Sequence, residues 1–151
     1  MSAPLLAAAP ASAASTPQSF DFSTQAGGTY AGWASAKGSI SYYDRDSFVY
    51  KGTVTDHCPK DGAGAYFGYW IRYANGELVF SGWKHSDRSG CDDGTSTSFN
   101  VTVNVEAGRR IQEVQFELAE CNLIDGGSYT SLKCGSTADD KSSTWKDNPY
   151  T

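Results

Sequence analysis

The sequence has little of what helical, membrane-spanning or nucleic-acid-binding proteins require. Its 151 residues include a single methionine. They contain no apolar run near the roughly 20 residues that a membrane-spanning helix needs. No apolar stripe with the helical period of about 3.6 residues persists for three turns. Lysine and arginine number 12 against 17 aspartates and glutamates, a formal net charge of −5. Because nucleic acids and anionic membranes attract basic surfaces, neither is an expected partner.

Glycine and aromatic residues are plentiful by contrast. The chain has 16 glycines and 13% aromatic residues, a composition that suits short strands joined by tight turns. Apolar and polar side chains alternate most clearly in residues 99–105 and 114–118. Residues 38–43 and 48–55 flank a polar turn and predict a hairpin. In all, about seven short strands predict an all-β domain, an antiparallel β-sandwich of the immunoglobulin-like or jelly-roll type.

The aromatic residues are densest in the middle of the chain, at residues 48–84. Residues 65–74 are apolar on both faces, which is typical of a central strand or of one that presents an aromatic face to a ligand. Asn75-Gly76 is the strongest hairpin signal, because this pair tolerates a positive φ. Four aromatic residues can either fill the interior, which is the favoured interpretation, or form a platform on which a sugar ring stacks. They are Tyr42, Tyr66, Trp70 and Trp83.

The first 28 residues predict a separate region. Ala11-Ser12-Ala13 follows a short apolar run, as at the end of a signal peptide, so we interpret the start as a signal-peptide remnant. The remainder has no sustained period and predicts a flexible segment in which Phe20 and Phe22 contact a partner. Residues 29–151 are expected to form one β-sandwich domain, with a first strand at residues 29–34.

Four cysteines allow three pairings. We expect Cys121 to pair with Cys134, 13 positions further on, as a local clasp across a loop. Cys58 and Cys91 would then join two loops at one end of the sandwich. Two disulfides and the signal-peptide remnant predict a secreted, extracellular protein.

The Cys58–Cys91 pairing would gather four carboxylates at one end of the domain: Asp56, Asp61, Asp92 and Asp93. Carboxylates on loops suit a calcium ion. Aspartate is also common in solvated turns, which is the favoured alternative, so no cofactor beyond this calcium option is predicted.

No catalytic set emerges from the sequence. His57 or His85 could act as the base of a serine triad, but the sequence has no G-x-S-x-G motif to supply the nucleophile. Both histidines are therefore interpreted as surface residues. Glu113, Glu117 and Glu120 offer paired acids for glycoside hydrolysis, but a solvent-facing row of glutamates is the favoured interpretation. The protein is therefore predicted to be non-enzymatic.

Three features together resemble small secreted proteins of actinomycetes: the stretch GSISYYDRDSFVYKGTVTDHCPKDGAGAYFGYWIRYANG, the loop between Cys121 and Cys134, and the ending DNPYT. The resemblance covers residues 38–151. Some proteins of this kind are adaptor subunits of umbrella-type antibacterial toxin particles. In these particles a flexible N-terminal segment inserts into a lectin subunit, and the folded domain docks on a scaffold subunit. The resemblance implies a similar adaptor here, with residues 14–28 as the inserting segment.

The leading functional hypothesis is therefore a protein-interaction module that binds another secreted protein, a scaffold or lectin subunit. A carbohydrate-binding module with Trp70 in contact with a glycan is the first alternative. The second is a protease inhibitor that presents residues 123–133 as a disulfide-held loop, since a rigid loop loses little entropy on binding.

Overall fold

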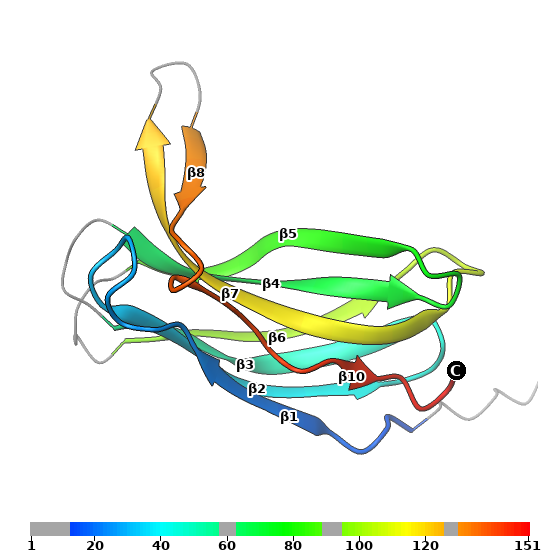
Figure 1. Ribbon diagram of the computed structural model, residues 1–151. Coiled ribbons are helices and arrows are strands. Elements are labelled where there is room, and N and C mark those ends of the chain that lie inside the picture. Colours follow the sequence, from blue (N-terminus) through cyan, green and yellow to red (C-terminus); the bar gives the residue numbers. More distant parts are fainter. Residues whose placement is uncertain (1–12, 58–62, 89–94, 126–129) are drawn as a thin grey trace, which may run out of the picture.

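The computed structural model describes residues 13–57, 63–88, 95–125 and 130–151, and every regular element within these ranges is a β-strand. The strands form two antiparallel sheets packed face to face, so the predicted β-sandwich is confirmed (Figure 1). In the same ranges no helix is long and apolar enough to cross a membrane. The strands are β1 (Gln18–Ser23), β2 (Trp33–Tyr42), β3 (Ser47–His57), β4 (Ala63–Tyr73), β5 (Leu78–Asp87), β6 (Thr97–Asn104), β7 (Ile111–Asp125), β8 (Thr130–Cys134), β9 (Asp140–Ser142) and β10 (Lys146–Asp147).

The strand order identifies the kind of sandwich. Sheet A has the order β1-β2-β3-β6, and sheet B has the order β10-β7-β4-β5, with β8 and β9 also paired to β7. The chain crosses between the sheets after β3, after β5 and after β6. Strands β2-β3-β6 opposite β7-β4-β5 correspond to A-B-E opposite F-C-C′ of an immunoglobulin-like sandwich. The topology thus matches the first of the two predicted types.

Side chains from the two inner faces form one core, because alternate residues of each strand point between the sheets. Tyr50 lies near its centre, with its ring 5.4 to 6.3 Å from five other core rings. Tyr42, one of the four residues predicted as a possible platform, is also fully buried there and is therefore a core residue. The other large core side chains are Phe20, Ile40, Phe48, Val54, Phe67, Tyr69, Ile71, Tyr73, Phe99, Ile111, Val114, Phe116 and Leu118.

The sandwich begins before residue 29, which corrects the expected domain boundary. Strand β1 pairs with β2 over its whole length, from Gln18 opposite Ile40 to Ser23 opposite Ser35. The segment that lacks a sustained period in the sequence is therefore an edge strand of sheet A. Its side chains alternate over only six residues, too few for a clear periodic signal.

Phe20 is a core residue, which corrects its expected role as a partner contact. Its side chain is 4% exposed and its ring lies 4.4 Å from that of Phe116. Gly38, opposite Phe20 in the register, leaves room for this ring, since a Cβ there would lie 2.7 Å from it. Phe22 is half-buried and packs against the same core. Neither phenylalanine is free to insert into another protein while β1 is paired.

The two hairpin predictions are confirmed, with one change in strand length. Asp44 Oδ1 accepts hydrogen bonds from the Asp46 amide (3.0 Å) and the Ser47 hydroxyl (2.7 Å) in the β2–β3 turn. Gly76 has φ +86° in the β4–β5 turn. The first strand predicted at residues 29–34 is wrong for residues 29–32, which precede β2. Its last two residues and most of the segment predicted at 38–43 form one continuous strand, β2, in register with β3.

Beyond sheet B, β7 continues and forms a hairpin with β8 that projects from the sandwich (Figure 1). Cys121 and Cys134 are directly opposite in this hairpin and form the predicted disulfide. Residues on both sides of the bridge are paired strands, so the expected disulfide-held loop is largely a β-hairpin. Cys58 and Cys91 lie outside the described residues, and their pairing stays a prediction.

Candidate binding surface

The outer face of sheet B carries four neighbouring aromatic side chains, which we call the aromatic cluster: Tyr66, Trp70, Phe80 and Trp83. The Phe80 ring lies 4.8 Å from Trp70 and 5.2 Å from Trp83, and Trp83 lies 6.5 Å from Tyr66. Tyr66 is 7% exposed, whereas the other three are half-buried. Trp70 and Trp83 thus lie on the solvent side of the sheet, away from the main core.

A bulge in β5 brings Phe80 and Trp83 to the same face. In a regular strand, residues three apart point to opposite sides. The β4–β5 register shifts on both sides of Gly68, and Gly82 in β5 has φ +73°. Such a bulge re-aims the side chains that follow it. Because alternation in the sequence does not account for a bulge, it did not predict that Phe80 lies on this face. Gly82, a glycine inside a strand, was the signal of the bulge.

Gly68 lies at the middle of the aromatic cluster. In the register it is opposite Trp83 on one side and Glu117 on the other. A Cβ at this position would lie 2.6 Å from the Gly82 carbonyl oxygen and 3.0 Å from the Phe80 ring. The absent side chain thus leaves room for the Phe80 ring beside β4, where it contacts both tryptophans.

Charged groups of β4 and β7 border the aromatic cluster. The Trp70 indole Nε1–H donates to Glu117 Oε2. Burial raises the pKa of Glu117 above its usual value, and the charge of Asp140 raises it further, although the bond from Trp70 opposes both. Arg72 forms an ion pair with Glu113 and lies over the Trp145 ring, 4.3 Å from its centroid. The expected row of solvent-facing glutamates is corrected here, because these carboxylates contact neighbouring side chains.

The projecting hairpin extends this face with aliphatic side chains. Leu123 and Leu132 are directly opposite and are 37% and 36% exposed. Both lie two positions from the disulfide cysteines, so they point to the same side as the bridge. The bridge in turn packs with Tyr66 and Trp83. We call the aromatic cluster together with Leu123 and Leu132 the docking face.

Glu120 is buried, which corrects its expected place on a solvent-facing row. It is 2% exposed and lies beside Asp139, which is fully buried. Asp139 accepts hydrogen bonds from the amides of Thr29 (2.7 Å) and Ser136 (2.7 Å), among others. Burial acts to raise the pKa of Asp139, but the bonds from Thr29, Glu120 and Ser136 outweigh it, so this pKa is lowered.

The pKa of Glu120 moves in the opposite direction. Burial, the hydrogen bond to Asp139 and the charges of Asp139 and Asp56 raise it to about 8. Glu120 Oε2 receives no hydrogen bond from the described residues. A neutral Glu120 that donates its proton to an ionised Asp139 satisfies both side chains. This acid pair joins the β1–β2 loop and the β8–β9 turn to the base of the hairpin.

Of the four aspartates predicted to bind calcium, the structure describes one. Asp56 is half-buried near the end of β3, and its amide donates to Asp87 Oδ2 at 3.0 Å. Asp61, Asp92 and Asp93 lie outside the described residues. Within the described part of the chain, no group of three or more His, Cys, Asp or Glu side chains is arranged to hold a metal ion. The calcium site stays a prediction.

Both histidines have partners, which corrects their interpretation as ordinary surface residues. His85 is half-buried between the sheets, where its Nε2 lies 2.9 Å from the Tyr50 hydroxyl, and burial lowers its pKa. His57 stacks on Trp33 with ring centroids 3.7 Å apart and lies 2.8 Å from the Ser35 hydroxyl. Ser35 lies in β2, which is paired with β1 on one side and with β3 on the other.

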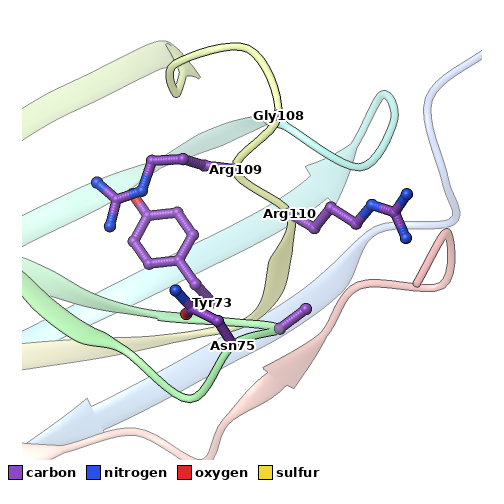
Figure 2. Close-up of a pocket in the computed structure, with 6 residues that line it drawn as sticks. Tyr73, Asn75, Gly108, Arg109 and Arg110 are labelled. Atoms are coloured by element: carbon purple, nitrogen blue, oxygen red, sulfur yellow. The ribbon is translucent and has the colours of Figure 1, made fainter.

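At the end of the sandwich that holds the β4–β5 and β6–β7 turns lies a hollow of about 350 Å³ (Figure 2). The Arg109 guanidinium lies over the Tyr73 ring, 3.8 Å from its centroid, and forms an ion pair with Glu77. Figure 2 shows that Arg110 points away from this pair. Arg109 thus connects the two turns.

Comparison with known proteins finds no matching family model, no matching curated protein and no matching solved structure.

Proposed function

We propose that the protein is a non-enzymatic module that binds another protein through the docking face. The observation that carries this proposal is a row of ring contacts from Trp70 across Phe80 to Trp83, which packs with the disulfide. Leu123 and Leu132 lie on the same side of the hairpin as this disulfide. Tryptophan and tyrosine are enriched among the few residues that carry most of the binding energy of protein interfaces. The rigid sheet beneath them limits the entropy that binding costs.

The hairpin favours a protein as the occupant. Leucine side chains have no flat π-face on which a sugar ring can stack, but they fill apolar pockets of a protein partner well. Because β1 is paired within sheet A, the proposed contact is a surface of the folded domain rather than a free N-terminal segment. Secretion and an adaptor role in a toxin particle remain proposals that rest on the resemblance and on the cysteines.

A pair of neighbouring hairpin residues offers a matched test. Leu123→Ser is expected to weaken capture of the partner about tenfold, which corresponds to roughly 1.4 kcal/mol. Ile124→Ser is the control, since Ile124 is 42% exposed but points to the opposite side of the hairpin. Each variant would be immobilised, exposed to culture fluid of the source organism, and the bound protein identified and titrated.

Equal loss in the two variants would contradict the proposal, because exposure rather than position would then matter. A wild-type protein that retains no partner would also contradict it. Circular dichroism melting of each variant checks that the fold is intact.

Carbohydrate binding is the second candidate, and the aromatic cluster favours it. Trp70 and Trp83 are half-buried on the solvent side and could each offer a ring face to a sugar. Under this hypothesis Trp70→Ala abolishes the response of tryptophan fluorescence to a polysaccharide, whereas Leu123→Ser leaves it unchanged. The protease-inhibitor hypothesis rests on residues 123–133 as the presented loop. Residues 126–129 of this segment lie outside the described residues, and the hypothesis stays a prediction.

A further inference from the structure

Sheet B presents two pairs of an aromatic ring and a carboxylate on its outer face. The first pair is Trp145 with Glu113. Arg72 completes it, because its guanidinium forms an ion pair with Glu113 and lies 4.3 Å from the centroid of the Trp145 ring. A cation over an aromatic face and next to a carboxylate gains from both the ring quadrupole and the opposite charge.

The second pair is Trp70 with Glu117. Trp70 lies two residues from Arg72 in β4, and Glu117 lies four residues from Glu113 in β7. The Trp70 Nε1–H donates to Glu117, which fixes the carboxylate at the edge of the indole. Asp140 in β9 adds a second negative charge, close enough to raise the pKa of Glu117. The ion pairs of the described residues are Arg72–Glu113 and Arg109–Glu77, so neither Glu117 nor Asp140 takes part in one.

We infer that the Trp70–Glu117 pair receives an arginine or lysine side chain of the protein that docks on this face. The inference rests on the proposed function and specifies the chemistry of the partner: a basic side chain flanked by apolar ones. Its basis is charge complementarity, because a chain of net charge −5 places the carboxylates of Glu117 and Asp140 near the half-buried Trp70 ring. The apolar flanks would contact Phe80, Trp83 and the hairpin leucines.

The contact has a direct effect on Glu117. Burial in the free protein raises the pKa of Glu117, so the environment disfavours its charged form. A guanidinium beside it would lower this pKa and restore the charge. The basic side chain thus satisfies a carboxylate whose hydrogen-bond donor in the sheet is an indole N–H.

Two blocked peptides that differ in one group test the inference: acetyl-Leu-Arg-Leu-amide and its citrulline analogue, which has the same shape without the charge. Binding would be followed by the NMR signal of the Trp70 indole N–H. We expect the arginine peptide to bind about 5-fold more tightly than the citrulline peptide, with a difference that disappears at high salt. The double variant Glu117→Gln, Asp140→Asn should bind both peptides equally.

Asp21→Asn, an exposed carboxylate on sheet A, is the control and should keep the 5-fold difference. Equal affinity of the two peptides for the wild-type protein would overturn the inference, as would no shift of the Trp70 signal with either peptide. The outcomes separate from those of the proposed function. Suppose that Leu123→Ser weakens capture of a partner, but the double variant binds this partner as tightly as the wild type does. The docking face would then be supported, whereas the inference that it receives a basic side chain would be contradicted.

Discussion

Raising the pH from about 5 to about 9.5 is expected to lower the free energy of unfolding by on the order of 4 kcal/mol through one side chain, Glu120. In the folded protein the pKa of Glu120 is raised to about 8, against a usual value of 4.5. Between these two values the folded state holds a proton that the unfolded state has lost. Stability therefore falls as the pH rises through this window, and the loss is complete above the folded pKa.

The buried acid pair explains the size of the expected effect. A Cβ at Gly28 or Gly135 would lie 2.1 or 2.2 Å from an oxygen of Asp139, so two glycines leave the space that this carboxylate occupies. Asp139 is held in its charged form by backbone amides, and Glu120 beside it must then stay neutral. Once Glu120 ionises, two negative charges share a buried site, and only one oxygen of Glu120 has a donor among the described residues, the Thr24 hydroxyl 3.4 Å from Oε1.

Glu120→Gln is expected to remove most of this pH dependence. The amide has nearly the shape of the protonated carboxyl and can donate to Asp139 at every pH. The variant should therefore match the wild type within about 1 kcal/mol near pH 5 and exceed its stability by about 3 kcal/mol near pH 9.5. Urea unfolding at a series of pH values measures both numbers.

Glu106→Gln, on the exposed β6–β7 turn, controls for the loss of a negative charge. A wild-type stability that does not change over this range would contradict the assignment of the proton. So would a Glu120→Gln variant that retains the wild-type slope.

The sequence predicted the parts of the fold that depend on alternation and on turn chemistry. Val101 and Val103 alternate with polar residues in β6, and Asn75-Gly76 supplies the positive φ of the β4–β5 turn. It did not predict that Glu120 is buried, because an inward-pointing glutamate looks the same in sequence as an outward-pointing one. Only the position of Asp139, 19 residues later, makes a neutral glutamate acceptable there.

Part of the candidate site could also be predicted from the alternation of side chains along a strand. Tyr66 and Trp70 were candidates for a platform, since a strand apolar on both sides must place one set outside the core. Phe80 was missed because its phase relative to Trp83 depends on the bulge at Gly82. The continuity with Leu123 and Leu132 depends on how far β7 extends past the sheet, which alternation within one strand does not determine.

The N-terminal strand was missed because its contribution depends on a single large side chain. Phe20 makes ring contacts with Phe22, Phe67 and Phe116, and its place is created by the missing side chain of Gly38. A glycine in β2 read alone suggests a weak strand. Read with Phe20 it marks the point where a neighbouring ring enters the core.

Phe20→Ala is accordingly expected to destabilise the protein by about 3 to 5 kcal/mol, the range for a buried phenylalanine whose removal leaves a cavity. Asp21→Ala on the exposed face of the same strand is the control and should change stability by about 0.5 kcal/mol or less. Deletion of residues 1–17 should lower the melting temperature slightly, since it removes the two hydrogen bonds between Ser15 and Tyr42. Deletion of residues 1–23 should lower it sharply, since it also removes β1. An unchanged melting temperature after the longer deletion would show that the first 23 residues are a dispensable arm, and Phe20 would then regain its place as a candidate contact with a partner.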